Sequence, residues 1–207
     1  TNKDNSDNNR KLFMFAGSIF SNKESRKIVW KIFLKDLYIE NSSLYIPLAK
    51  GRVFQIEPTD KVLENNKEKI IENYSEEFYN EVKYHKMYMG HILPENLYEE
   101  IGNYKYSFIP RCVSYKDSLN FRPILYVQNN VLPLLDDQYD PSYLMIPKEI
   151  QNKIAVKDYK DIEEKVKYFE EHTDEKNDIL NKLKDLFNLD KFYNSDYVSE
   201  IINSTWN

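Results

Sequence analysis

Short apolar stretches separated by polar turns dominate the first half of the chain. The stretches at 12–20, 27–39 and 44–56 are rich in β-branched and aromatic residues, a composition that favours strands. The links between them look too short to hold helical crossovers, so we expect antiparallel hairpins. The same pattern predicts a further hairpin at 121–135, with its turn at Gln128-Asn129-Asn130.

Two longer segments show the helical period instead. In 60–86, apolar residues four or seven apart form one stripe, and Thr59 or Asp60 can cap the N-terminus. In 157–171 a similar stripe is made by Ile162, Val166 and Phe169. Shorter elements complete the prediction, with strands at 87–93, 104–110 and 154–156 and helices at 96–101, 114–120, 178–187 and 196–202.

The order of these elements is similar in the two halves, because each half has a hairpin followed by a long helix. We therefore expect one globular domain at 11–207, made of two pseudo-repeats at about 11–120 and 121–207. Residues 1–10 are polar and are expected to be disordered. The predicted fold class is α/β (α+β), with antiparallel-rich sheets flanked by long helices and pseudo-twofold symmetry between the halves.

Charge and composition exclude several classes of protein. The net charge is −5, with acids and bases mixed along the chain, which argues against a nucleic-acid binder. The single cysteine excludes an internal disulfide framework and a multi-cysteine zinc site. No apolar run approaches the roughly 18 residues that a membrane-spanning helix needs.

The histidines and the cysteine give no recognisable catalytic motif. His85, His91 and His172 have no second ligand at a metal-binding spacing. Cys112 stands beside Arg111, which can lower a thiol pKa, but no base is recognisable near it in the sequence.

The acidic pairs Glu99-Glu100 and Asp136-Asp137 lie in charged segments and are interpreted as solvated faces. Only four glycines are present, and none stands in a phosphate-binding pattern. We therefore expect no enzyme activity, no metal and no cofactor. The alternative from another class is an enzyme whose site is assembled from distant residues through Cys112 or His91.

A protein that binds unfolded segments needs accessible apolar surface with a polar rim. The proline-containing hairpins at 44–56 and 121–135 are candidates, because one face of each can be buried while the other is offered. The predicted client-binding surface consists of Tyr45, Phe54, Ile56, Phe108, Leu125, Val127, Leu132, Leu134 and Tyr143.

Several segments resemble motifs of the Tic twenty-two family, the soluble intermembrane-space component of plastid protein import. They are MYMGHILPENLY at 87–98, YSFIP at 106–110, RPILYV at 122–127, Tyr143-Leu144 and IAVKDYKDIEEKVKYF at 154–169. The resemblance covers about residues 50 to 202.

This resemblance implies two related α/β halves and chaperone-like binding of preproteins between the envelope membranes of a plastid, here an apicoplast. The implied partners are unfolded or precursor polypeptides and plastid translocon components, with peripheral membrane association and without nucleic acid. No enzyme activity or cofactor is implied. The alternative is an interaction or scaffold protein of a parasite-specific complex.

Overall fold

One parallel β-sheet organises the part of the chain that the computed structural model describes, which is residues 9–17, 28–46, 67–68, 70–72, 75–90, 92, 94–111, 122–143 and 145–188. Within these residues, six strands pair in the order β3-β2-β1-β4-β5-β6, and every pair is parallel. The strands are β1 (Lys11–Ala16), β2 (Ser43–Tyr45), β3 (Tyr88–Gly90), β4 (Tyr104–Ile109), β5 (Leu132–Asp136) and β6 (Ala155–Val156).

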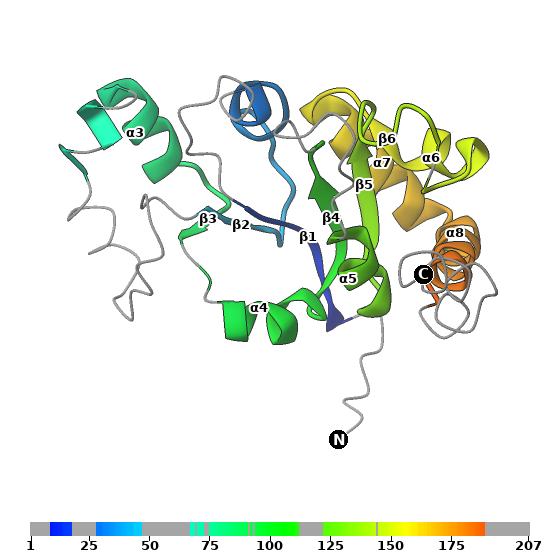
Figure 1. Cartoon of the computed structure of the whole chain (residues 1–207). Coiled ribbons are helices and arrows are strands. Elements are labelled where there is room, and N and C mark those ends of the chain that lie inside the picture. Colours follow the sequence, from blue (N-terminus) through cyan, green and yellow to red (C-terminus); the bar gives the residue numbers. More distant parts are fainter. Residues whose placement is uncertain are drawn as a thin grey trace, which may run out of the picture.

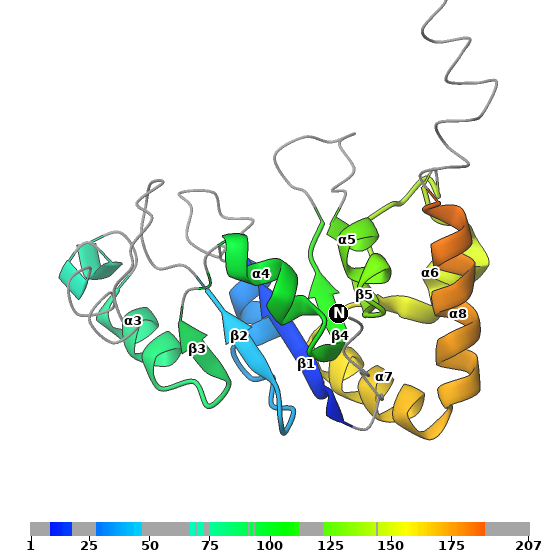
Figure 2. The same ribbon diagram turned by 90° about the horizontal axis from the view of Figure 1, so that it is seen from below.

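Helices cover both faces of this sheet. They are η2 (Trp30–Leu34, a short π-helix), α3 (Glu76–Lys83), α4 (Pro94–Ile101), α5 (Arg122–Gln128), α6 (Lys148–Ile154), α7 (Tyr159–Glu171) and α8 (Thr173–Leu186). In Figure 1, α3, η2 and α7 lie above the sheet, while α4 and α5 lie below it. Figure 2 shows the same molecule from below, with α4 and α5 in front of the strands and α6 and α8 beyond β5. None of the helices in the described segments is long and apolar enough to cross a bilayer.

The predicted antiparallel hairpins are wrong, because the links between neighbouring strands contain helices. The link from β1 to β2 holds η2, the link from β4 to β5 holds α5, and the link from β5 to β6 holds α6. A helical crossover carries the chain back to the end of the sheet at which the previous strand began, so the next strand runs parallel to that strand.

The segment 27–39 is the first of these misassigned links. Trp30, Phe33, Leu34 and Leu37 are all buried, and their spacing of three, four and seven residues is helical. The Lys35 N–H donates to the Trp30 carbonyl at 2.8 Å, which closes a π-helical turn. The β-branched and aromatic content of the segment suggested strands, but its period is that of a helix.

The segment 121–135 is a helix followed by a strand, not a hairpin. Pro123 stands in the first turn of α5, where its missing N–H leaves no hydrogen bond unmade. The helix ends before Asn130, whose φ of 59° turns the chain into β5. The Val131 N–H donates to the Tyr126 carbonyl at 2.9 Å and fixes this turn.

Several other predicted elements are confirmed. Strands form within the predicted segments at 12–20, 87–93, 104–110 and 154–156, and α4 covers the predicted helix at 96–101. Helix α7 is capped by Asp158, whose carboxylate accepts from the N–H groups of Lys160 and Asp161, and its predicted apolar stripe is buried. Helix α3 begins after its cap Ser75, while the predicted caps at 59 and 60 and the helix at 196–202 lie outside the described residues.

The predicted pseudo-twofold symmetry is also wrong. The first predicted half supplies β1 to β4, and β5 and β6 extend the same sheet beyond β4 instead of forming a second one. The proposed halves share an order of apolar segments but not a geometry, because the first contributes four strands to the sheet and the second contributes two.

His85 gives the fold a testable pH dependence. Its half-buried ring packs edge-on against Trp30 with 5.7 Å between the ring centroids, and its Nδ1 accepts from the Met87 N–H at 3.2 Å. Burial lowers the pKa of His85, although hydrogen bonds to backbone carbonyls oppose the shift. The unfolded chain therefore takes up the proton first as the pH falls. The stability that this group contributes is complete above its unfolded pKa of about 6.5 and is lost below it.

We expect the free energy of unfolding to fall between about pH 7.5 and pH 5.5, and to fall less steeply in His85→Asn. Urea unfolding across this range measures both slopes. Asn181→Gln, at an exposed position of α8 that carries no titratable group, is the control and should keep the wild-type slope. An unchanged slope in His85→Asn would contradict this assignment.

Candidate functional site

The strand order marks one edge of the sheet as the place to look for a ligand. Because all strands are parallel, their carboxyl ends meet at the same edge. The order runs from β1 outward to β3 on one side and from β4 outward to β6 on the other, so the direction of winding reverses between β1 and β4. In open α/β sheets, ligands bind outside the carboxyl ends of the strands at such a switch point.

Gly17 and Arg122 lie at this switch point. Gly17 directly follows β1, and Arg122 is the first residue of α5. The Arg122 guanidinium donates to the Ala16 carbonyl at 3.1 Å, and a Cβ atom on Gly17 would lie only 3.1 Å from the same guanidinium nitrogen. The glycine therefore gives the Arg122 cation room beside the end of β1.

Arg111 and Asp136 lie at the ends of the next two strands, β4 and β5. The Arg111 Nε is 3.8 Å from the Asp136 Oδ2, and the Arg111 N–H donates to the same oxygen at 3.4 Å. The Gln138 N–H donates to the Asp136 Oδ1 at 3.1 Å. Asp136 thus holds the arginine and two loops in place.

Asp136 is only 5% exposed, so its interpretation as part of a solvated face is wrong. Burial raises the pKa of its carboxyl group, while hydrogen bonds from Gln138 and Arg111 and the Arg111 charge act in the opposite direction. The sequence could not show this burial, because it depends on segments far apart in the chain, such as Arg111, that come together at the end of β5.

These side chains enclose a hollow of about 100 Å³ at the carboxyl edge. Its polar wall consists of Arg111, Asp136, Asp137 and Lys157, and its apolar wall consists of residues from η2 and the turn before it, including Phe33. The Phe33 ring stacks on Phe108 of β4 with 4.6 Å between centroids, which fixes η2 over the sheet. Two cations therefore line the hollow, and Arg122 adds a third along the same edge.

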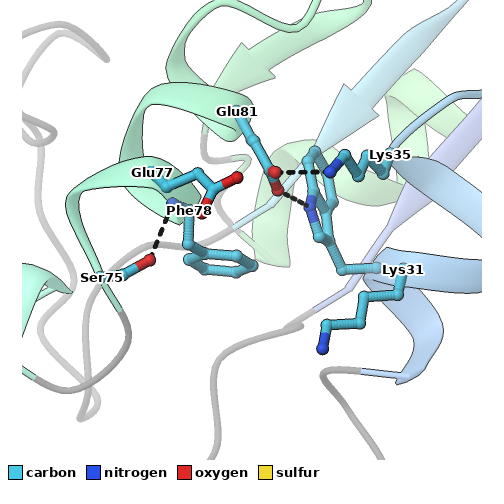
Figure 3. Close-up of a pocket in the computed structure, with 7 residues that line it drawn as sticks. Lys31, Lys35, Ser75, Glu77, Phe78 and Glu81 are labelled. Atoms are coloured by element: carbon cyan, nitrogen blue, oxygen red, sulfur yellow. Dashed lines mark hydrogen bonds and ion pairs between the residues drawn. The ribbon is translucent and has the colours of Figure 1, made fainter.

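A second hollow of about 370 Å³ lies between η2 and α3 (Figure 3). Glu81 of α3 reaches across to η2, where its carboxylate accepts from the Trp30 Nε1 at 3.0 Å and the Lys35 Nζ at 2.6 Å. Ser75 accepts from the Phe78 N–H and caps α3. The two lysines of this hollow are balanced by Glu77 and Glu81, and the two cations of the first hollow face two carboxylates as well. The carboxyl edge has an excess of cations only through Arg122, and in that respect it suits an anion better than this hollow does.

The structure places most of the predicted client-binding residues in the core. Tyr45, Phe108, Val127, Leu132 and Leu134 are buried. Leu125 is half-buried, Tyr143 is exposed, and Phe54 and Ile56 lie outside the described residues. The described members of this set share no single surface, and core packing is enough to explain their apolar character.

Tyr45 has a further structural use in a polar network that joins α4 to the sheet. Its hydroxyl donates to the Glu100 Oε1 at 2.7 Å and lies 3.2 Å from the Tyr104 hydroxyl. Burial, together with the hydrogen bonds to Tyr104 and Glu100, raises the pKa of Tyr45. Glu100 is therefore held by tyrosines and is not a free surface acid.

The other candidates for chemistry do not converge. His85 packs between η2 and α3, and His172 is exposed at the start of α8. His91 and Cys112 lie outside the described residues. Among the residues that the structure describes, no group of three or more histidine, cysteine and carboxylate side chains could hold a metal ion.

Comparison with known proteins gives one consistent likeness, in structure alone. No protein-family model and no curated protein matches the sequence. Three solved structures match with a TM-score of 0.56 each. The first is a T4 phage BGT point mutant in complex with UDP-glucose, at 16% identity over 88% of this chain and 44% of that one. The second is T4 phage BGT with its UDP-glucose substrate, at 15% identity over 88% of this chain and 45% of that one. The third is the DNA-modifying enzyme β-glucosyltransferase in the presence and absence of uridine diphosphoglucose, at 14% identity over 89% of this chain and 50% of that one.

This likeness contradicts the prediction of a non-enzymatic protein-transport factor with chaperone-like activity, because these solved proteins are all glucosyltransferases. At 14–16% identity the likeness establishes the fold, and the chain spans only about half the length of the proteins that it matches. The plastid location, the precursor partners and the Tic twenty-two resemblance stay predictions of the sequence.

Sequence reasoning missed Gly17, Arg111, Arg122 and Lys157. Each of them stands within two residues of the end of a strand or at the start of the helix that follows one. A parallel arrangement of the apolar segments would have brought all four to one edge, whereas the antiparallel arrangement scatters them.

Asp136→Asn tests the burial of this carboxyl group. Folding raises the pKa of this carboxyl group, so the unfolded state loses the proton at a lower pH than the folded state does. The wild type should therefore lose stability relative to Asp136→Asn between about pH 4 and the raised pKa. Urea unfolding of both proteins at several pH values measures this difference. A wild type that instead gains on the variant as the pH rises would show that Asp136 is stabilised as an anion.

Proposed function

We propose that this chain is a glycosyltransferase, or the part of one that binds a nucleotide-diphosphate sugar at the carboxyl edge of its sheet. The observation that carries the proposal is the all-parallel β3-β2-β1-β4-β5-β6 sheet with Arg122, Arg111 and Lys157 along the carboxyl ends of its strands. The likeness to UDP-glucose-dependent β-glucosyltransferases supports this choice of ligand.

A diphosphate fits this edge because its charge can be met by guanidinium groups. Arginine presents several N–H donors in a planar fork, which suits phosphate oxygens better than a point charge does. Asp136 orients the Arg111 group, and Gly17 lets the Arg122 guanidinium approach the end of β1 closely. The apolar wall from η2 limits water on one side of the hollow.

The same groups would assist sugar transfer. The acceptor hydroxyl oxygen bonds to the anomeric carbon of the sugar while the bond from that carbon to the diphosphate oxygen breaks. The electron pair leaves with the diphosphate, and the hydroxyl proton goes to a base. Negative charge therefore grows on the diphosphate, where preorganised cations stabilise the transition state more than the ground state.

Titration calorimetry with UDP and UDP-glucose tests the proposal. We expect binding by the wild type, and we expect Arg111→Ala or Arg122→Ala to weaken it about tenfold or more, the scale of one charge-assisted hydrogen bond. Lys182→Ala is the matched control, because Lys182 lies on α8 in an exposed pair with Asp178 and should leave the affinity unchanged. The wild type should also release UDP slowly from UDP-glucose.

Two results would count against this function. One is no heat of binding with either nucleotide at millimolar concentration. The other is an affinity that the two arginine substitutions leave equal to that of Lys182→Ala, because the ligand would then bind away from the switch point.

A further inference from the structure

A separate cleft of about 910 Å³ opens beside the edge strand β6. Its walls come from α6, α7 and the start of α8, and residues that follow β5, namely Asp137, Gln138 and Tyr143, complete the lining. Asp137 and Lys157 line both this cleft and the hollow at the carboxyl edge, so the two are adjacent.

The charges of the cleft argue against a polyanionic ligand. Lys153, Lys157 and Lys165 are opposed by four carboxylates, among them Glu164 and Glu175. The Lys153 Nζ is itself paired with the Glu175 Oε1 at 2.6 Å. A wall with this mixture of donors and acceptors and no excess of cations suits a neutral ligand that carries many hydroxyl groups.

Two polar groups of the cleft have unused hydrogen-bonding capacity. The Lys165 Nζ donates to the Lys153 carbonyl at 2.7 Å, which uses one of its three donors, and burial lowers the pKa of this amine. Gln151 is 2% exposed, and its side-chain oxygen has no hydrogen-bond partner. A buried amide oxygen without a partner is costly, and a small movement of this amide would let it meet a ligand hydroxyl.

Tyr143 is the most unusual residue of the cleft. Its φ is 54°, a left-handed backbone that a bulky L-residue rarely adopts. Buried Asp140 holds it there, because its carboxylate accepts from the N–H groups of Met145 at 2.8 Å and Ile146 at 3.0 Å, while its carbonyl accepts from the Tyr143 N–H. The Tyr143 side chain is nevertheless 39% exposed, with the Lys148 Nζ over its ring at 5.6 Å from the centroid, so core packing does not explain why a large ring stands at this position.

Tyr168 contributes a second partly exposed ring to the same cleft, with one face stacked on His172 at 4.1 Å between the ring centroids. A sugar ring has an apolar C–H face and a rim of hydroxyl groups, so it can lie on an aromatic face while its hydroxyls reach the polar wall. The cleft provides both kinds of surface.

We propose that this cleft binds a neutral hexose ring, with Tyr143 as the stacking platform and Lys165 and Gln151 as hydrogen-bonding partners. The inference rests on the proposed function, because it places a sugar next to the diphosphate site through the shared wall of Asp137 and Lys157. The ring is either the hexose of the nucleotide sugar or a hexose of the acceptor.

Substitution of Tyr143 separates binding from folding. Tyr143→Gly and Tyr143→Asn remove the ring and place residues that tolerate a positive φ, so the unfolding temperature should stay the same or rise. Both variants should weaken hexose binding about fivefold, the scale of one aromatic contact, whereas Tyr143→Phe should keep it. The affinity for UDP should not change in any of the three.

NMR titrations with methyl glucoside, UDP and UDP-glucose identify the source of the hexose. A loss of UDP-glucose affinity in Tyr143→Gly with unchanged UDP affinity assigns the cleft to the donor sugar. A loss of methyl glucoside affinity, with methyl glucoside and UDP-glucose bound together by the wild type, assigns it to the acceptor.

The proposal is overturned if Tyr143→Gly and Tyr143→Asn leave both methyl glucoside and UDP-glucose affinities as they are in the wild type, including the case in which neither binds. A different result would overturn the proposed function: UDP binding would be absent, or Arg111→Ala and Arg122→Ala would leave it unchanged.

Discussion

Parallel pairing of β1 with both β2 and β4 is the constraint on which the rest of the structure depends. A strand paired on both sides and covered on both faces must be apolar throughout, and Phe13, Met14 and Phe15 are almost completely buried. Parallel neighbours cannot be joined by tight turns, so each link carries a helix back across the sheet. Each buried phenylalanine contributes roughly 1.5–3 kcal/mol to this layered core.

The same constraint gathers the polar residues of the proposed site. Arg111, Asp136 and Lys157 lie at the ends of three different strands, and parallel pairing brings them to one edge. Arg122 reaches the end of β1 because α5 begins at that edge and Gly17 leaves room for the guanidinium. The cleft beside β6 adds an aromatic and polar surface next to these cations. A charged diphosphate and a neutral ring attached to it would therefore meet two adjacent surfaces with matching chemistry.

Local patterns in the sequence predicted individual elements better than their arrangement. The stripe of Ile162, Val166 and Phe169 depends on near neighbours, and its helix formed as predicted. A strand also formed in the predicted segment 104–110, but it is buried on both faces. The segment 27–39 and the first part of 121–135, which forms α5, were mistaken for strands because their composition outweighed their helical spacing. That error turned crossovers into hairpins and a parallel sheet into antiparallel ones. The candidate site was not predicted for the same reason, since Gly17, Arg111 and Arg122 come to one edge only through pairing between distant strands.

Mapping UDP onto the isotope-labelled protein by amide chemical shifts tests the central claim most directly. Binding at the switch point predicts shift changes at the carboxyl edge, in Gly17, Arg111, Gln138 and Lys157. The opposite edge, where Asn41, Asn103 and Asn130 precede β2, β4 and β5, should stay unperturbed. Shift changes at that opposite edge, or no changes with saturating UDP, would contradict the account.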